Sequence, residues 1–455
     1  MKNTILHFYE GLSGSGVVIS VTYNQSRVIF DFGAPFHPDT NVYDGVVEHR
    51  NQRALTTALA LKQIPAVPGV FPKADLWPLH LQSFEDSPLH TGIIISHLHL
   101  DHMSAIGMVH PDVPVYLHES ALKLQDALEK IGEGLGKRNS FTSFQYHEPF
   151  LIQEIRITPF FSDHPCLGAA SFLIQTPDAN LFYTGDIRYH GLQREEAFAE
   201  IEQAAKTPID LLLLDVTTSS PERFFYGEVA PELWQPGKDI LPGMISEEAI
   251  YADIFAHLSD DPGIAFFNIY HRDMQLIEAL IAGCAKINRT LVFEQKTAFV
   301  LKQVLGIAVP IVISDTGDYD SSLSGFEVIA KAEIKKNPQR YFVQNSYRNI
   351  LELLDYPKGG LYYHLFGEPF GGKAYRIMEN MVKRCNHRFF AFTNLFSFNH
   401  AYPNHLSWLI KTMKPKGIVG VHSSAPEKLD NRGYPQYFPK KDVDYIWRDG
   451  ILKEV

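Results

Sequence analysis

The sequence predicts an α/β protein with a second α/β domain inserted into the first, on three observations. Apolar runs typical of buried strands repeatedly end in histidine or aspartate, as Gly92–Ile95 does just before His97. Helices and short apolar strands alternate between residues 244 and 388, which is typical of a domain built on a parallel sheet. Apolar runs after residue 388 resume the first pattern, so we expect the chain to return there to its first domain.

Composition and length indicate a globular protein with two or three cores. The chain has 455 residues, of which 45% are hydrophobic and 12% aromatic. The N-terminus lacks the apolar core of a signal peptide, and the chain contains no run near the roughly 18 apolar residues of a membrane span. We therefore expect a cytoplasmic protein with no membrane partner. Three widely spaced cysteines fit a reducing compartment, and Cys166 is expected to be a packing residue.

The charge balance weakens a nucleic-acid role without excluding one. The formal net charge is −11, whereas a protein that binds nucleic acid through its overall field would be basic. Residues 331–388 nevertheless contain eleven Lys or Arg against five Asp or Glu. Interleaved tyrosines suit a groove that tracks a nucleic-acid backbone and stacks its bases, although solvated helix surfaces explain these charges equally well. The tyrosines are Tyr341, Tyr347, Tyr356, Tyr362, Tyr363 and Tyr375.

The densest group of candidate ligands is the stretch Ser96–His102, with three histidines and one aspartate. His97 and His99 lie two positions apart on extended backbone and can share one metal ion. Asp101 and His102 follow in a turn and can reach a second ion. Such ligands suit Zn²⁺, with Mn²⁺ or Fe²⁺ as alternatives. A cluster without metal is disfavoured, because crowded imidazoles repel one another when protonated.

The N-terminal part of the first domain is predicted as strands and loops around this stretch. Strands at 17–23 and 27–30 form a hairpin that ends at Asp31. Regularly spaced prolines indicate loops over 34–91, with a helical patch at 52–62, and no chemistry is assigned there. Beyond the histidines the pattern predicts a strand at 113–117, a helix at 120–130 and a strand at 152–158.

The next elements bring further candidate ligands to strand ends. His164 follows the strand at 152–158 and can complete a three-histidine site with His97 and His99. Strands at 171–175 and 181–183 lead to Asp186, which is placed to bridge two cations. Arg188 and His190 come next, either behind the site or facing substrate. A strand at 211–214 ends at Asp215, and the proline- and glycine-rich stretch up to residue 243 indicates a domain boundary.

The remaining elements complete the inserted domain and the return. Inside the insertion we expect helices at 247–258, 273–286 and 297–305 and strands at 264–268, 291–293 and 311–314. Strands at 388–392 and 417–421 are then expected to rejoin the first domain. The return carries His400, a helix at 403–412, Pro415 and His422, and His422 again follows an apolar strand.

These motifs resemble those of a known family. The His-x-His-x-Asp-His pattern of residues 97–102 resembles the metallo-β-lactamase superfamily, whose fold stacks two sheets with helices outside. With the insertion and the spacing of His400, Pro415 and His422, the chain is similar to the β-CASP group and its RNase J-like branch. The resemblance implies a metallo-β-lactamase αβ/βα sandwich from 1–218, an inserted β-CASP-like α/β domain from 219–388, and the returning part of the sandwich from 389–455.

The resemblance also implies site roles. His97, His99 and His164 would hold one cation, Asp101, His102 and His422 the other, and Asp186 would bridge the two, with Zn²⁺ favoured and Mn²⁺ possible. Asp215 would bind His400 near the scissile phosphate, so that Asp101, Asp186, Asp215 and His400 form the implied catalytic set. Asp31 would orient the histidine loop. Phe398 and Asn399 depart from the family, which has a Ser-Gly pair there, and the spacing leaves His405 as a helix-surface histidine.

We therefore expect a two-metal hydrolase that cleaves phosphodiester bonds, most consistent with an RNase J-like ribonuclease. Two adjacent cations activate water and stabilise an in-line displacement, as phosphodiester cleavage requires. Single-stranded RNA is the expected partner, DNA is less favoured, and a homo-oligomer is possible. Exonuclease and endonuclease action both remain open. One alternative is a hydrolase of a small ester, thioester or lactone with the insertion as a lid, and another is a non-catalytic binding protein.

Overall fold

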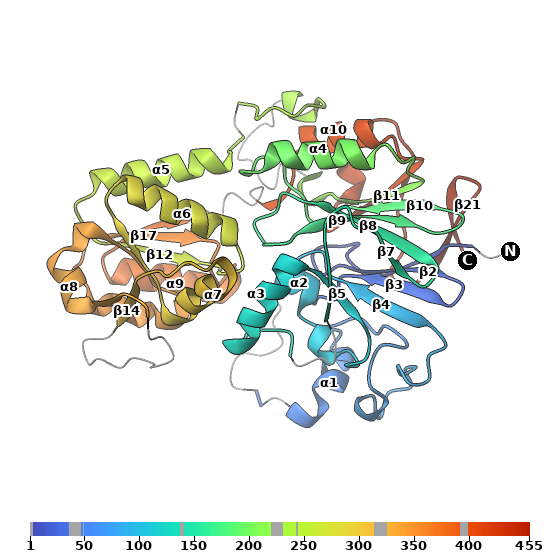
Figure 1. The fold of residues 1–455 in the computed structure, drawn as a ribbon, viewed down its shortest axis with the longest axis horizontal. Coiled ribbons are helices and arrows are strands. Elements are labelled where there is room, and N and C mark those ends of the chain that lie inside the picture. The colour runs from blue at the N-terminus through green and yellow to red at the C-terminus, as the bar shows by residue number, and fades with distance from the viewer. Residues whose placement is uncertain are drawn as a thin grey trace.

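The protein forms two lobes, which lie side by side in Figure 1. The computed structural model describes residues 3–35, 47, 48, 50–136, 141–219, 231–242, 244–313, 325–391 and 399–455. The first lobe contains two large sheets and both ends of the chain, whereas the second contains a smaller parallel sheet. Across the described residues, every helix is too short or too polar to cross a membrane.

The first large sheet has eight strands in the order β22-β21-β1-β2-β3-β4-β5-β6. Its edge joins the two ends of the chain, because β1 pairs antiparallel with β21. Beyond β3 the strands run parallel, so that the carboxyl ends of β3, β4 and β5 meet at one edge. The strands are β1 (Ile5–Glu10), β2 (Val18–Tyr23), β3 (Ser26–Phe30), β4 (His90–Ile94), β5 (Val115–His118), β6 (Phe141–Phe144), β21 (Asp444–Arg448) and β22 (Ile451–Glu454).

The second large sheet has seven strands in the order β20-β19-β11-β10-β9-β8-β7. The predicted strand at 152–158 is in fact two antiparallel strands, since Gln153 adopts a left-handed φ of 53° and turns the chain. The strands are β7 (Phe150–Ile152), β8 (Ile155–Phe161), β9 (Ala170–Gln175), β10 (Asn180–Tyr183), β11 (Leu211–Asp215), β19 (Gly417–Val421) and β20 (Gln436–Tyr437).

The two large sheets stack face to face with helices on their outer faces. Side chains alternate along each strand, so Phe30 and Phe172 meet in the core between the sheets. On the outer face of the first sheet lie α1 (Ala54–Ala60) and α3 (Glu119–Lys130), and on that of the second lie α4 (Arg194–Ala204) and α10 (Pro403–Met413). This arrangement confirms the predicted αβ/βα sandwich.

The inserted lobe is built on a parallel sheet with strand order β13-β16-β12-β17-β18. Local signals set its helices: the Ser246 side chain accepts a hydrogen bond from Ala249 N at the start of α5, and Gly306 ends α7 with a φ of 71°. Its elements are α5 (Glu247–Asp260), β12 (Ala265–Ile269), α6 (Met274–Lys286), β13 (Thr290–Val292), α7 (Gln295–Leu305), β14 (Ile311–Ile313), β15 (Val328–Ala330), α8 (Lys331–Lys336), β16 (Tyr341–Gln344), β17 (Leu361–Leu365), α9 (Gly372–Arg384) and β18 (Arg388–Ala391).

The point at which the chain returns to the first lobe differs from the prediction. Strand β18 pairs parallel with β17 in the inserted sheet, so the prediction that 388–392 rejoins the first domain is wrong for residues 388–391. Phe392 lies outside the described residues. Strand β19 does rejoin the sandwich, where it pairs parallel with β11 as expected. The limits 1–218, 219–388 and 389–455 stay a prediction, and we propose to move the second junction past Ala391.

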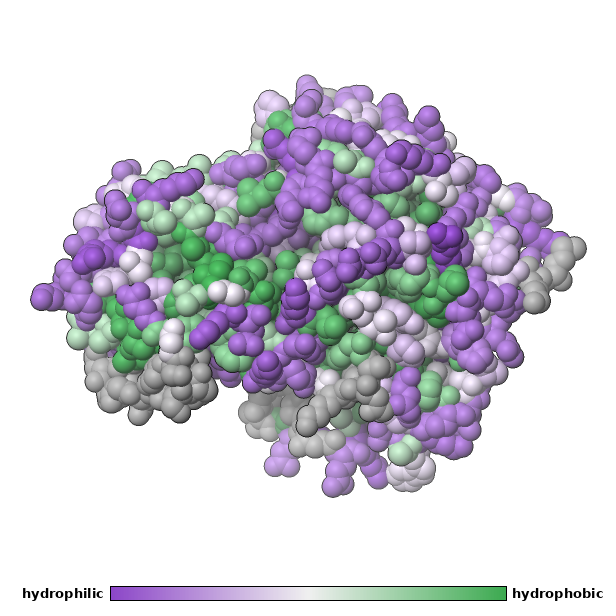
Figure 2. All heavy atoms as spheres, viewed as in Figure 1, coloured by the Kyte–Doolittle hydropathy of each residue, from purple (hydrophilic) through white to green (hydrophobic). Residues whose placement is uncertain are grey.

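The predicted stacking platforms of the inserted lobe are largely internal. Tyr341, Tyr356, Tyr362 and Tyr363 are buried in its core, so that part of the prediction is wrong, while Tyr347 and Tyr375 remain partly exposed. Figure 2 shows hydrophilic side chains over most of one face, with apolar atoms gathered on the inserted lobe near its junction with the first. The four buried tyrosine rings pack in the core of the inserted lobe, so they are not available to stack bases at its surface.

Candidate metal centre

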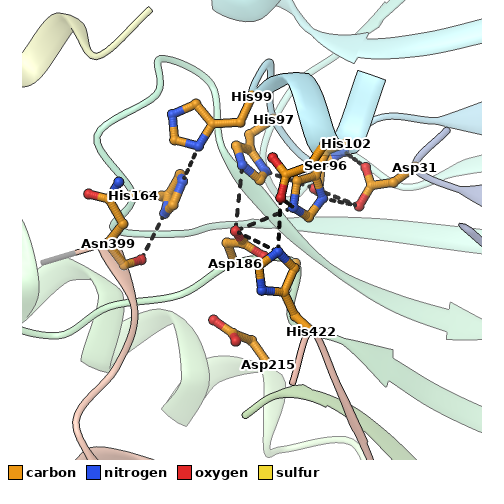
Figure 3. Close-up of polar contacts among 12 residues, drawn as sticks. Asp31, Ser96, His97, His99, His102, His164, Asp186, Asp215, Asn399 and His422 are labelled. Atoms are coloured by element: carbon orange, nitrogen blue, oxygen red, sulfur yellow. Dashed lines mark hydrogen bonds and ion pairs between the residues drawn. The ribbon is translucent and has the colours of Figure 1, made fainter. Parts of the chain in front are cut away.

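The candidate ligands come from strand ends that converge at one edge of the sandwich. The histidine loop follows β4, His164 follows β8, Asp186 follows β10 and His422 follows β19. Because β10, β11 and β19 are parallel, their carboxyl ends deliver side chains to the same edge. Figure 3 shows the ligand side chains gathered around Asp186 from separate elements, with Asp31 on the outer side of Ser96 and His102.

All residues predicted as ligands lie in groups that could hold a metal ion. In each group the nearest ligand atoms are within 4.8 Å of one another. Two of these groups coincide with the predicted sets, and two others share Asp186. The groups are His97–His99–His164, Asp101–His102–His422, His97–His102–Asp186 and Asp186–His400–His422. The predicted residues are therefore brought together, and their role as ligands stays a prediction.

Asp186 lies at the middle of the cluster. Its Oδ2 atom is 3.3 Å from His102 Nε2, 3.8 Å from His97 Nε2 and 3.8 Å from His422 Nε2. The same oxygen lies 4.0 Å from His400 Nε2. One carboxylate thus faces both predicted ligand sets, which is the position that a bridging ligand needs.

The protonation of four imidazoles follows from their outer hydrogen bonds. Each of these histidines points Nδ1 at an oxygen outside the cluster and Nε2 into it. A carbonyl or carboxylate oxygen can only accept, so the Nδ1 facing it carries a proton and Nε2 is the nitrogen that can bind a cation. The outer partners are Asp31 Oδ2 for His102 (2.9 Å), Asn399 O for His164 (3.1 Å), Thr217 Oγ1 for His422 (2.8 Å) and Ser96 Oγ for His97 (3.0 Å).

The two hydroxyl partners, Thr217 and Ser96, also accept from the Nδ1 atom of their histidine, because each gives its own proton to a carboxylate. Thr217 Oγ1 donates to Asp215 Oδ1 at 2.6 Å, and Ser96 Oγ donates to Asp31 Oδ2 at 2.9 Å. Each hydroxyl has a single proton, so it accepts from the neighbouring histidine. His97 and His164 thereby keep Nε2 lone pairs toward the centre. His102 and His422 also turn Nε2 inward, where it faces the carboxylates of Asp186 and Asp101 at 3.3 and 3.1 Å, so a cation bound there would replace the Nε2 proton.

The donor set fits a divalent cation. His97 Nε2 and His102 Nε2 are buried yet make no hydrogen bond to any residue that the structure describes. A buried nitrogen without a partner is costly, and metal coordination removes that cost. Imidazole and carboxylate ligands in this number suit Zn²⁺ and related ions. The donor chemistry of these clusters therefore supports the use of a divalent metal.

Electrostatics separate the cluster into neutral and charged groups. Burial, followed by the neighbouring histidines, lowers the pKa of His97 well below its usual range, which keeps this imidazole neutral as a metal ligand must be. Burial opposes charge on Asp101 as well, but His102 and His422 lower the pKa of Asp101 to about 2. Burial likewise opposes charge on His422, but Asp186 and Asp101 raise its pKa to about 9.

Asp31 organises the histidine loop, as the resemblance implied. Its buried carboxylate accepts hydrogen bonds from Ser96 N (2.7 Å), Ser96 Oγ (2.9 Å), His102 Nδ1 (2.9 Å) and Tyr183 OH (2.6 Å). The backbone here is tightly fitted. Asp31 has a φ of 59°, and a Cβ placed on Gly33 would lie 1.7 Å from Asp101 O. The Asp31–Gly33 turn and the histidine loop are therefore held in close backbone contact.

His400 and Asp215 lie together as expected, at the side of the cluster. His400 Nδ1 is 2.8 Å from Asp215 Oδ2, and His400 remains partly exposed. His405 is different. The prediction that it lies on the helix surface is wrong, because it is fully buried on the face of α10 that packs against Phe198 of α4.

Arg188, left open by the sequence, lies behind the site. Its buried guanidinium donates from Nη2 to Glu247 Oε2 (3.0 Å) and Gln275 Oε1 (2.8 Å), and its Nε lies 3.4 Å from Asp163 Oδ1. Asp163 directly precedes His164, so Arg188 links a ligand loop to two helices of the inserted lobe. His190 is also fully buried.

The cysteines play no part in the cluster. Cys166 packs in the core as predicted, and all three cysteines are buried and free.

Sequence reasoning missed the outer partners Ser96, Thr217 and Tyr183. Each lies within three positions of a residue that the sequence did identify: Ser96 precedes His97, Thr217 follows Asp215 by two positions, and Tyr183 precedes Asp186 by three. A rule that extends each identified residue by three positions would have found them. It would not have predicted which side chain each one contacts.

A family model described as a beta-lactamase superfamily domain matches residues 64–238, the part that carries the histidine loop, His164, Asp186 and Asp215. Residues 64–238 are thus similar to a domain of the superfamily that the sequence motifs resemble. The chain is also similar to named ribonucleases. It is 28% identical over 148 residues to an endoribonuclease YSH1 of Gibberella zeae, covering 28% of this chain and 17% of that protein.

A second relative is a Ribonuclease J of Pyrococcus abyssi, 22% identical over 258 residues, or 53% of this chain and 51% of that protein. The matches thus span at most about half of these relatives. The crystal structure of a protein of unknown function from Enterococcus faecalis aligns over 98% of this chain and 100% of its own, with a TM-score of 0.77 and 26% identity. The predicted relationship to RNase J-like proteins of this superfamily is confirmed, and the superfamily and these names support a hydrolase.

Proposed function

We propose that this chain is a two-metal phosphodiesterase that cleaves single-stranded RNA, as an RNase J-like ribonuclease acting in the cytoplasm. The observation that carries the proposal is the pair of inward-facing ligand groups on either side of Asp186. The ribonuclease names of two relatives support RNA as the substrate. DNA is a weaker candidate, and a homo-oligomer remains compatible with the proposal.

Two Zn²⁺ ions, with Mn²⁺ as the alternative, are the proposed cofactors. His97, His99 and His164 would hold one ion, Asp101, His102 and His422 the other, and Asp186 would touch both. When bound, such a pair supplies an activated water and charge stabilisation for an in-line displacement at phosphorus.

In this proposal His400 acts as the general acid. His400 Nδ1 donates to Asp215 Oδ2 at an N–O distance of 2.8 Å, so Nε2 faces Asp186, where the phosphate would bind. A proton on Nε2 can then pass to the departing oxygen, and a positioned acid of this kind contributes about 10²- to 10⁴-fold in rate. Asp215 stabilises the charged imidazole during this step. It also accepts hydrogen bonds from Thr217 N and Oγ1, which fix its own orientation.

Basic side chains on the inserted lobe support an RNA-binding surface. Lys373, Arg376 and Arg384 are exposed on α9. Three other basic residues of the 331–388 region have carboxylate partners: Lys331 with Asp355 at 2.8 Å, Lys383 with Glu379, and Arg388 with Asp261. Backbone contacts from the exposed cations would make RNA binding salt-dependent.

The test begins with metal content and substrate class. We would measure Zn²⁺ and Mn²⁺ per chain by mass spectrometry, then supply single-stranded RNA, DNA of the same sequence, and a panel of thioesters and lactones. RNA with a 5′-monophosphate, RNA with a 5′-triphosphate and circular RNA would separate exonuclease from endonuclease action. We expect cleavage of RNA and two metal ions per chain. Hydrolysis of thioesters or lactones without RNA cleavage would replace the proposal with the small-ester alternative.

Two variants test the residue roles against a matched control. Asp186→Asn should abolish cleavage and release metal, since it weakens the shared ligand. His400→Asn should lower cleavage about 10²- to 10⁴-fold while leaving the metal content unchanged. Loss of metal in His400→Asn would instead make His400 a ligand, as its group with Asp186 and His422 allows. His80→Asn, at an exposed histidine of the same lobe, should match the wild type.

A further inference from the structure

The segment Tyr270–Asp273, which follows β12, joins the inserted lobe to the first lobe. Arg272 is buried, and it donates from Nη1 to Leu98 O at 3.2 Å and from Nη2 to Glu133 O at 2.8 Å. His271 Nε2 lies 2.9 Å from the Glu133 carboxylate. These contacts hold the segment against the loop that carries the ligand histidines.

Asp273 is placed at the start of α6 but does not cap that helix. Aspartate in the N-cap position usually accepts a hydrogen bond from the second or third helical N–H. Within the described chain the Asp273 side chain makes no such bond to α6. Its Oδ1 atom instead lies 2.7 Å from His99 Nε2, and the side chain is almost fully buried. A carboxylate that would ordinarily stabilise its own helix is thus directed at a candidate metal ligand 174 residues away in the sequence.

This contact decides which nitrogen of His99 is available. An ionised carboxylate only accepts, so His99 Nε2 carries the proton and Nδ1 keeps its lone pair. Nδ1 lies 3.1 Å from His164 Nε2, whose own lone pair is free because His164 Nδ1 donates to Asn399 O. Two lone pairs that face each other at this distance repel, and a cation bound by both nitrogens replaces that repulsion with attraction.

We propose that Asp273 is a positioning residue that the inserted lobe contributes to the His97–His99–His164 metal site. It fixes the ring orientation and tautomer of His99, and so raises the affinity of this site for a divalent cation. Outer partners of metal-bound histidines typically change metal affinity 10- to 100-fold. The inference rests on the proposed metal centre, and it makes docking of the inserted lobe and metal binding mutually stabilising.

The two metal sites should respond differently. His102 and His422 take their outer partners, Asp31 and Thr217, from the first lobe. Removal of the Asp273 carboxylate should therefore lower the affinity of the His97–His99–His164 site for its ion and leave the affinity of the other site unchanged. A general loss of structure would weaken both.

The experiment compares the full chain with Asp273→Ala, Asp273→Asn and the control Asp260→Asn, at an exposed aspartate that ends α5 of the same lobe. Zn²⁺ affinity would be measured by competition with a chelator, and ¹⁵N spectra of the histidine rings would report the protonated nitrogen of His99. We expect Asp273→Ala to bind one Zn²⁺ as the wild type does and the second about 10- to 100-fold more weakly. Asp273→Asn should lose less, because its amide oxygen can still accept from Nε2–H.

The outcomes are distinct. Equal affinities in Asp273→Ala, Asp273→Asn and the control, with two ions bound to the wild type, would overturn this inference while leaving the metal centre intact. If Asp273→Ala lowers the Zn²⁺ affinity of both sites equally, the inference is overturned as well. A wild type that binds no metal would overturn the proposed function and this inference together. Asp273→Asn keeps the size of the side chain, so it decides the question if Asp273→Ala does not fold.

Discussion

Replacing Asp31 by asparagine tests whether the histidine loop is held by one buried carboxylate. The two oxygens of Asp31 accept four hydrogen bonds, three at Oδ2 and one, from Ser96 N, at Oδ1. The amide of asparagine has one oxygen. With that oxygen in the place of Oδ2, the NH₂ group faces Ser96 N–H across 2.7 Å, donor against donor.

The expected cost follows from this count. A buried donor without an acceptor costs about 1 to 3 kcal/mol, and the three remaining hydrogen bonds weaken because their acceptor is no longer charged. We therefore expect Asp31→Asn to lower the free energy of unfolding of the metal-free protein by about 2 to 4 kcal/mol. Since His102 loses its charged outer partner, Zn²⁺ affinity should also fall about 10- to 100-fold.

The assay is urea denaturation of the chelator-treated protein, followed by Zn²⁺ titration. Asparagine tolerates the left-handed φ of 59° at position 31, so backbone strain does not confuse the result. Asp449→Asn is a matched control, because Asp449 is exposed and has a φ of 56°. An Asp31→Asn protein within about 0.5 kcal/mol of the wild type, with unchanged Zn²⁺ affinity, would refute the reasoning.

Three further changes probe other parts of the structure. Gly33→Ala puts a Cβ 1.7 Å from Asp101 O, so the turn must move and Zn²⁺ affinity should fall in a metal titration. Glu247→Gln leaves the buried Arg188 charge poorly compensated and should lower the free energy of unfolding by about 3 to 5 kcal/mol in urea. Burial lowers the pKa of His405 to about 4, so acidification from pH 6.5 to 4 protonates the unfolded chain first and destabilises the fold by up to about 1.4 kcal/mol per pH unit. His405→Phe should make this slope shallower.

Each of these predictions has a control on the same chain. Gly237→Ala adds a methyl group into open space and should leave metal affinity unchanged. Glu248→Gln and His257→Phe change exposed residues of α5 and should leave stability and its pH dependence near those of the wild type. If Glu247→Gln costs no more than Glu248→Gln, or if His405→Phe keeps the wild-type slope, the corresponding burial argument fails.

Much of the candidate site could be predicted because its signals are local. An apolar run followed by histidine or aspartate marks a strand end, and carboxyl ends of neighbouring parallel strands share an edge. That reasoning was enough to name His97, His99, His164 and Asp186 as neighbours, and the family resemblance added His422 beside Asp101 and His102; the structure brings all of them together. The resemblance also implied that Asp215 binds His400, and the two side chains lie 2.8 Å apart.

Other features could not be predicted from the sequence, because they depend on which elements pack against each other in the folded protein. The run 388–391 is apolar in either sheet, and only its pairing with β17 assigns it to the inserted lobe. The interleaved tyrosines looked like a binding face in the sequence, but packing of a small sheet drew Tyr362 and Tyr363 inside. His405 likewise has a neighbour in α4 that its own helix could not reveal.

By itself, the sequence determined the α/β class, the strand-end clusters and the residue types that suit a divalent metal, because hydrophobic period and side-chain chemistry are properties of short segments. The tertiary structure decided which nitrogen His99, His102, His164 and His422 turn inward. That choice is made by Asp31, Asn399, Thr217 and Asp273, which lie between 71 and 235 residues from the histidines they hold. Hydrogen-bond direction is set by the atom that lies opposite, and only the folded chain places that atom.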